Sequence, residues 1–247
     1  MQNNSLVNPF NKVMMLSPIN FKKPAIWFGV LLFLINSILL PDAAFSQDLT
    51  CPDSMAVYLH FDEEDGEYIE DQLGRHFVSA SNEPKSVLGI LGNAKEFNGT
   101  NQYVNLGDHN DFDFADDGSF SIELWAKFTN VSGSNKVMVG RDSQTNDVHW
   151  WFGVDAASGH ARSTVRDIFG YTVNIEGTRA LNDDQWHHMV LVRDTIGKLT
   201  IYVDGTEEVS DTFDYVYSFF ASTTVDIGYL AFEGRKNFFY DGLLDEV

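Results

Sequence analysis

Residues 186–205, WHHMVLVRDTIGKLTIYVDG, hold two adjacent histidines and two aspartates, residue types that could form a catalytic site. In an extended strand successive side chains point to opposite faces, so His187 and His188 cannot serve one reaction centre. Both aspartates fall at strand ends, and Asp204-Gly205 is typical of a two-residue hairpin turn. The stretch therefore predicts two paired strands, in which packing and hydrogen bonding account for the histidines.

After residue 56 the chain reads as short alternating segments separated by Gly, Asn and Asp, and no segment keeps apolar residues at helical spacing over three turns. Many short strands with frequent turns predict an antiparallel sandwich or barrel. The abundant Phe and Tyr suit the half-buried faces of a large two-sheet core. The expected strands lie within residues 55–61, 94–107, 119–128, 136–140, 148–154, 161–166, 171–176, 186–193, 199–203, 207–209, 224–230 and 238–247.

The first 46 residues have the order of a secretory signal peptide. Lys12, Lys22 and Lys23 precede an apolar run, residues 25–40, which is followed by Pro41 and a small-residue exit. An uncleaved membrane anchor is the alternative, but the run of 16 residues is shorter than the ~20 needed to span a bilayer. We therefore expect export with cleavage after Ser46, a secreted or cell-surface location and no membrane insertion after cleavage.

The expected mature chain consists of a short linker, residues 47–55, and one domain, residues 56–247. Removing three lysines and one aspartate takes the net charge from −20 to −22, which argues against nucleic acid as a partner. Strong negative charge makes a hard cation such as Ca²⁺ the natural small partner. Cys51, the single cysteine, cannot form a disulfide within the chain, so it is either a free thiol or paired with a partner beyond this sequence.

Four segments follow one another in an order found in a known family. They are AKEFNGTNQYVNLG (94–107), SFSIELWAKF (119–128), the WHHMV and LTIYVDG parts of 186–205, and YDGLLDEV (240–247). Together they resemble the laminin G-like, concanavalin A-like jelly-roll family over residues 56–247. The resemblance implies an all-β, two-sheet antiparallel jelly-roll sandwich of the concanavalin A-like class. In that family Asp-Glu-Val leads into a further stretch, so we expect a domain shortened at its C-terminus.

The resemblance also implies a calcium site. In the family the terminal strands pair, which would bring Asp62, after the first strand, close to Asp245 in the last. Many members bind one Ca²⁺ through aspartates and main-chain carbonyls, and Ca²⁺ takes six to eight oxygen ligands. Asp71, in the following loop, is the third expected ligand.

Glucanases that share this sandwich place catalytic carboxylates on alternate residues of one strand, so that one acts as nucleophile and the other as acid. Here the acidic stretch 64–71 is loop-like, and residues 111–117 contain aspartates in a turn-rich setting. Nucleophile elbows, phosphate-binding loops and zinc spacings are not found in the sequence. We therefore expect no catalytic site.

A sugar-binding surface is the third candidate. Alternation in residues 148–154 places Trp150 in the core and leaves His149 and Trp151 on the other face. Trp151 would offer an aromatic platform for a sugar ring, or would instead be covered by a loop. Hydrogen bonds would come from side chains on a neighbouring strand and loop, Arg166, Asp142 and Asp147.

These features predict an exported, non-catalytic binding module for a glycan or cell-surface ligand, carbohydrate-binding or adhesive, with a structural calcium ion. Because one fold hosts many functions, two alternatives stay open. The first is a glycoside-processing enzyme of the same sandwich class. The second is a ligand-free spacer of a larger surface protein.

Overall fold

The computed structural model describes residues 54–115, 118–212, 218–232, 235–236 and 238–247, in which nearly all regular structure is β-strand. The predicted signal peptide, Cys51 and most of the predicted linker lie outside these residues. Within the same ranges no helix is long and apolar enough to cross a membrane.

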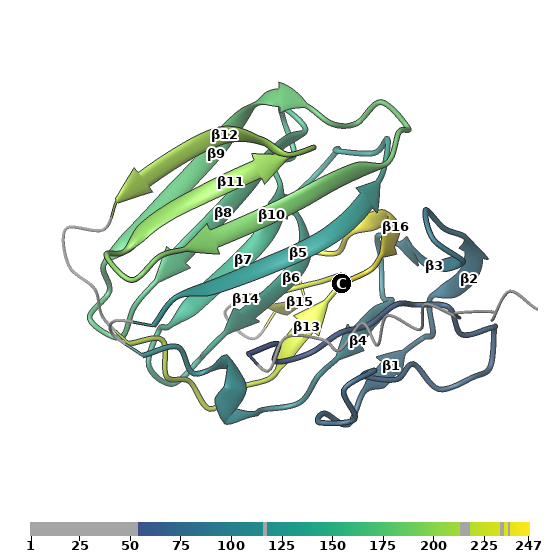
Figure 1. The fold of residues 1–247 in the computed structure, drawn as a ribbon, viewed down its shortest axis with the longest axis horizontal. Coiled ribbons are helices and arrows are strands. Elements are labelled where there is room, and N and C mark those ends of the chain that lie inside the picture. Colours follow the sequence, from purple (N-terminus) through teal and green to yellow (C-terminus); the bar gives the residue numbers. More distant parts are fainter. Residues whose placement is uncertain (1–53, 116–117, 213–217, 233–234, 237) are drawn as a thin grey trace, which may run out of the picture. The chain divides into compact units, whose positions relative to one another are not determined.

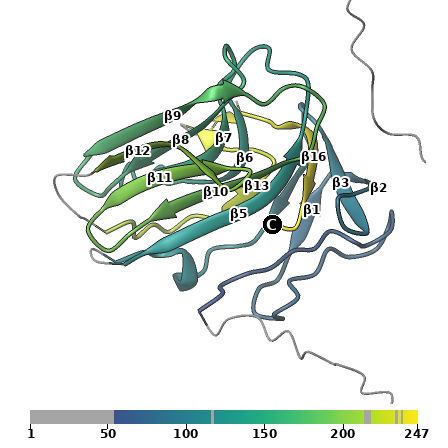
Figure 2. The ribbon, with the colours of Figure 1, turned by 45° about the horizontal axis from the view of Figure 1, so that its top comes forward.

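Two seven-stranded sheets stack as layers (Figures 1 and 2). In the first sheet the strand order is β1 (Ser79–Ser81), β4 (Tyr103–Asn105), β13 (Val225–Ile227), β6 (Lys136–Asp142), β7 (His149–Val154), β8 (His160–Arg166) and β9 (Thr172–Ala180). In the second it is β12 (Thr206–Thr212), β11 (Lys198–Val203), β10 (His187–Arg193), β5 (Phe120–Lys127), β16 (Asp241–Asp245), β3 (Asn93–Asn98) and β2 (Lys85–Leu88). Neighbouring strands are antiparallel, which confirms the predicted two-sheet sandwich.

The core lies between the sheets, and in β7 it follows the predicted alternation. Trp150 and Phe152 of β7 enter it from the first sheet, and Leu124, Met189 and Leu191 enter it from the second. Burying a side chain of this size contributes about 1.5–3 kcal/mol relative to leaving it in water. A one-residue shift in any of these strands would move its apolar set to the outer face, so the alternation also determines the register.

The stretch 186–205 forms two paired strands and a hairpin, as predicted. Asp204 and Gly205 have positive φ angles of 51° and 76°, and Val203 pairs with Thr206 across the turn. His187 is buried and lies between two carboxylates, with Nδ1 2.9 Å from Asp204 Oδ2 and Nε2 3.1 Å from Asp183 Oδ1.

His188, the neighbouring histidine, points to the opposite face. Its Nε2 lies 2.8 Å from Glu123 Oε1, and its ring centroid is 5.0 Å from that of Trp125. The two histidines therefore have separate partners and do not meet at one centre.

The predicted strand at residues 55–61 is wrong. Phe61 has a φ of 59°, a left-handed conformation that interrupts an extended strand. Leu59 instead exchanges two backbone hydrogen bonds of 2.8 and 2.9 Å with Val247, which joins this segment to the last residue of the chain. The strands β1 and β2 and the small hairpin of β14 (Ala231–Phe232) and β15 (Arg235–Lys236) were not predicted.

A short 3₁₀ turn, η1 (Asn110–Phe112), precedes β5 and is held by the buried guanidinium of Arg141 on β6. Arg141 donates to Phe112 O at 2.8 Å, to Asp113 Oδ1 at 2.7 Å and to Asp108 Oδ1 at 2.9 Å. It also donates to the carbonyls of Ala221 and Thr223. One side chain therefore joins residues 108–113 to residues 221–223.

Replacing Arg141 with Met should lower the free energy of unfolding by about 3–5 kcal/mol, because buried acceptors lose their charged donor. Urea denaturation measures this change. Arg179→Met is the matched control, since Arg179 is 44% exposed and pairs with Asp204 and Glu208. A surface pair of this kind contributes about 0–1 kcal/mol, and equal losses in the two variants would contradict the structural role of Arg141.

Candidate functional site

A pocket of about 170 Å³ opens on the outer face of the first sheet, over β6, β7 and β8. The pairing of β7 with its neighbours builds it, since Trp151 is aligned with Gly140 of β6 and Thr164 of β8. A Cβ at Gly140 would lie 2.8 Å from Leu230 Cδ1, so glycine lets the covering segment approach the sheet. The pocket is lined by Asn135, Val137, His149, Trp151, Arg162, Thr164, Leu230, Phe232 and Phe238.

Trp151 lies on the outer face of β7, as predicted, but it is 7% exposed. It packs with Val137, Leu230 and Phe238 in an apolar cluster separate from the main core. Of the two predicted alternatives for Trp151, the structure thus shows the covered side chain. Its ring forms part of the pocket wall and is not an open platform.

Two polar side chains of β8 enter the pocket wall from fixed positions. Arg162 donates to Asp155 Oδ2 at 2.6 Å, and Thr164 Oγ1 donates to Asn174 Oδ1 at 2.6 Å. Burial would raise the pKa of Asp155, but hydrogen bonds from Ala157 N, Ser158 N and Arg162 outweigh it and hold the pKa below its usual value. The ionised carboxylate keeps the guanidinium oriented, which leaves other N–H groups of Arg162 to donate to a ligand.

His149 is the second predicted residue in the pocket wall. Burial lowers the pKa of its imidazole, the Arg166 guanidinium lowers it further, and Asp147 partly opposes them. His149 is therefore neutral at pH 7, when one ring nitrogen donates and the other accepts a hydrogen bond.

The other three predicted ligand-binding residues lie beside the pocket without lining it. Arg166 pairs with Asp147, and Asp142 lies 3.8 Å from His149 Nδ1 and accepts a hydrogen bond from Gln144. Sequence reasoning missed Arg162 and Thr164, although alternation along residues 161–166 places them on the same face as Arg166.

The predicted calcium ligands Asp62 and Asp245 both contact the turn between β2 and β3. Asp62 Oδ1 accepts from Asn93 N at 2.7 Å, and Asp245 Oδ2 accepts from Ile90 N at 2.8 Å and Leu91 N at 3.2 Å. Burial raises the pKa of Asp245 to about 6. Its Oδ1 atom is buried and has no hydrogen-bond partner among the described residues.

Asp71, the third predicted ligand, has a different environment. Its carboxylate accepts from the backbone N–H groups of Tyr58, Leu73, Arg75 and His76 at 3.0–3.1 Å. Although burial would raise its pKa, these bonds and one from the His76 ring hold it below the usual value. The oxygens of Asp62, Asp71 and Asp245 do not lie within 4.8 Å of one another.

The alternating acidic spacing of a glucanase strand does occur in Glu63, Asp65 and Glu67. These residues lie in a loop that contains a turn, so alternation does not place them on one strand face. Asp65 Oδ1 accepts from Ser86 N at 2.6 Å and Glu67 Oε2 accepts from Glu64 N at 3.0 Å. Asp65 therefore joins this loop to β2, and Glu67 stabilises the turn within the loop.

The model of a laminin G-like family, described as the concanavalin A-like lectin/glucanases superfamily, matches residues 98–247. The chain belongs to this superfamily. The predicted family and fold are thereby confirmed. A comparison with curated proteins gives no match.

Solved structures with the same fold include binding domains and an enzyme-associated domain. The binding domain of Paraclostridial Mosquitocidal Protein 1 is 14% identical with a TM-score of 0.61, over 77% of this chain and 47% of that one. The binding domain of Botulinum Neurotoxin serotype G is 13% identical with a TM-score of 0.59, over 77% and 46%. The chain thus spans about half the length of these toxin domains.

A third structure is Domain 4 of AbnA, a GH43 extracellular arabinanase from Geobacillus stearothermophilus, in complex with arabinotriose. It is 19% identical to this chain with a TM-score of 0.56, over 77% of this chain and 88% of that one. At such low identity these likenesses establish the shared fold alone.

The titration of His149 should respond to its two charged neighbours in opposite directions. Arg166→Gln should raise the His149 pKa, and Asp147→Asn should lower it, as followed by NMR. A folded-state pKa below the unfolded value means that stability is lost as the pH falls from about 6.5 down through the folded-state pKa. Lys85→Met, on edge strand β2 of the other sheet, is the control and should leave the His149 titration unchanged. Shifts of the same sign in the Arg166 and Asp147 variants would contradict this electrostatic account.

Proposed function

We propose that this protein is a non-catalytic binding module that takes one unit or the end of a glycan in the pocket over β6, β7 and β8. The observation that carries the proposal is the make-up of the pocket wall, in which aromatic side chains stand beside Arg162 and Thr164. Sites for small polar ligands commonly combine an apolar wall with a few oriented polar groups. At about 170 Å³ the pocket is smaller than the ~300–1,000 Å³ of typical drug-sized sites, which favours a single sugar ring.

The chemistry of the wall also favours binding over hydrolysis. Canonical glycoside hydrolysis uses two carboxyl groups on either side of the scissile bond. The described lining of the pocket contains neither Asp nor Glu. Assaying a panel of polysaccharides for released reducing ends tests the enzyme alternative, because a non-catalytic module releases none.

We further propose that the protein acts outside the cytoplasm, as a secreted or surface-held module. The basic residues, apolar run and small-residue exit at residues 12–46 support this, as does the net charge of −20. The Paraclostridial, botulinum and AbnA structures described above are toxin binding domains and part of an extracellular arabinanase. A glycan or receptor on a cell surface is the partner class that fits this location.

A structural Ca²⁺ bound by Asp62 and Asp245 is the third part of the proposal. The buried Oδ1 of Asp245, which has no partner among the described residues, supports it, since a buried carboxylate oxygen without a donor is costly unless a cation or proton satisfies it. Asp71 is left out of this proposed site, because backbone donors already occupy its oxygens.

Glycan binding should depend on Arg162 and Trp151. On a glycan array that includes arabinotriose, Arg162→Met should weaken binding by about tenfold or more, because a hydrogen bond to a charged group contributes about 1.5–3 kcal/mol. Trp151→Phe keeps most of the packing and should weaken binding through lost ring contact. Arg179→Met is the surface control and should bind like the parent. Undiminished binding by folded Arg162→Met and Trp151→Phe proteins would refute the pocket.

Calcium should raise the melting temperature of metal-stripped protein by several degrees. Asp245→Asn should remove most of this rise, because it takes away the buried charge while keeping an oxygen for Ile90 N and Leu91 N. Asp211→Asn, on strand β12 of the same sheet, is the control and should keep the full rise. An unchanged melt of the parent on calcium addition would show that Asp62 and Asp245 only support the turn.

A further inference from the structure

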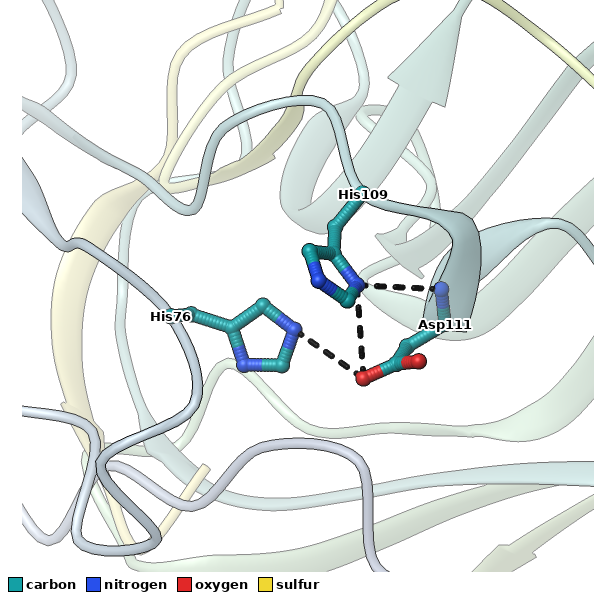
Figure 3. Close-up of side chains that lie close together, drawn as sticks. All are labelled: His76, His109 and Asp111. Atoms are coloured by element: carbon teal, nitrogen blue, oxygen red, sulfur yellow. Dashed lines mark hydrogen bonds and ion pairs between the residues drawn. The ribbon is translucent and has the colours of Figure 1, made fainter.

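Two histidines and an aspartate, none of which lines the pocket, lie close together in Figure 3. His76 comes from the segment before β1, and His109 and Asp111 come from the start of η1. One nitrogen of each imidazole and one oxygen of Asp111 all lie within 4.8 Å of one another. Within the described residues, this is the one group of three or more His, Cys, Asp or Glu side chains with such spacing.

The tautomer of His76 follows from its partner on the opposite side of the ring. Its Nδ1 lies 3.1 Å from Asp71 Oδ2, and an ionised carboxylate accepts only, so Nδ1 carries the proton. His76 Nε2 faces Asp111 Oδ2 at 3.4 Å, and in the neutral ring with the proton on Nδ1 it presents a lone pair. The side chain is 1% exposed, and Nε2 forms no hydrogen bond within the part of the chain that the structure describes.

A carboxylate behind a histidine is the usual outer-shell arrangement of protein metal sites, where it orients the ring and raises its basicity. Asp71 has this position, and backbone N–H groups of residues 58, 73, 75 and 76 hold it in place. The Phe112 ring, 5.1 Å from the His76 ring, packs beside it. His76 is thus oriented before any ligand arrives.

The second half of the cluster is held independently. Arg141 binds Asp108, Phe112 and Asp113, which flank His109 and Asp111 on both sides. This buried guanidinium limits the movement of the 108–113 segment. The two ligand-bearing segments therefore have separate supports.

The distances fit a small tetrahedral cation. Asp111 Oδ2 lies 3.4 Å from His76 Nε2 and 3.3 Å from His109 Nδ1. Ligands bound at about 2.0–2.2 Å in a tetrahedron lie about 3.3–3.6 Å apart, so two of the three edges already have the required length. We propose that His76 Nε2, His109 Nδ1 and Asp111 Oδ2 bind a Zn²⁺-type transition metal ion, with water at the fourth position.

One existing interaction competes with the metal. Asp111 N donates to His109 Nδ1 at 3.2 Å, so a small rotation of the His109 ring must exchange this bond for the metal. His109 is 47% exposed and Asp111 39%, which leaves room for that rotation and for entry of the ion. A single hydrogen bond at a half-exposed site stabilises the protein much less than a metal–ligand set does.

The ligand types distinguish this cluster from the proposed calcium site. Imidazole suits zinc, copper and nickel, whereas Ca²⁺ takes oxygen ligands from carboxylates and carbonyls. The net charge of −20 raises the local concentration of either cation. Once bound, zinc would join the segment before β1 to η1 and so stabilise the end of the first sheet.

Metal-stripped protein is titrated with Zn²⁺ by calorimetry and with Co²⁺ by visible absorption, which reports tetrahedral nitrogen and oxygen ligation. The parent should bind one equivalent. His109→Asn and Asp111→Asn should each weaken binding by more than about 100-fold, because removing a ligand costs more than removing its outer partner. At zinc 100 times the Kd, the parent melting temperature should rise by about 5–10 °C and that of His109→Asn should not.

The matched control is His160→Asn, since His160 forms a similar 3.3 Å pair with Glu176 elsewhere on the first sheet. It should bind zinc like the parent. The melting shift produced by calcium should persist in His109→Asn, which separates the two cation sites. The zinc site would be overturned if the parent did not bind zinc stoichiometrically. Equal zinc affinities of the His109→Asn and His160→Asn variants would also overturn it.

Discussion

The buried guanidinium of Arg141 holds together segments that the strand ladders alone leave unconnected. It lies on β6, between β13 and β7, and its five donors reach residues 108–113 and 221–223. The same strand carries Val137, which lines the pocket. Because a buried charge without its partners is costly, the loops must close around Arg141 when the domain folds. One strand thus supports the pocket on its outer face and the His109–Asp111 segment at its end.

Sequence periodicity predicted strands whose successive side chains point to opposite faces. In β7 alternation placed Trp150 in the core and Trp151 on the outer face, and Asp204-Gly205 identified the hairpin. Prediction failed where burial is weak or the backbone is irregular. Strands β1 and β2 are mostly exposed and carry little alternation, and Phe61 adopts a positive φ that no neighbouring residue signals. Such elements depend on partners distant in the chain.

The residues of the candidate sites also divide into those that strand alternation predicts and those that it does not. His149 and Trp151 could be predicted to share a face because alternate residues of a strand point the same way, and pairing with β8 would have added Arg162 and Thr164. The residues that cover the pocket could not be predicted, because their position depends on how the chain after β13 returns over the sheet. These residues are Leu230, Phe232 and Phe238. His76 and His109 are 33 residues apart and follow no motif. Their approach results from two loops that are each held by a different buried charge, Asp71 and Arg141.

In a chain with so many carboxylates, acidity alone does not identify a cation site. The number of hydrogen-bond donors around each carboxylate distinguishes the candidates. Asp71 is surrounded by backbone N–H groups, which stabilise its charge, keep its pKa low and leave its oxygens no need of a metal. Asp245 is buried with donors on one oxygen alone, so its pKa is raised to about 6 and its charge needs a further partner. Asp111 faces two imidazoles from an exposed position. A cation stabilises a carboxylate most where backbone donors are too few to do so and where the other ligands are already oriented. By that criterion Asp71 acts on a metal through His76, as the group that orients a ligand.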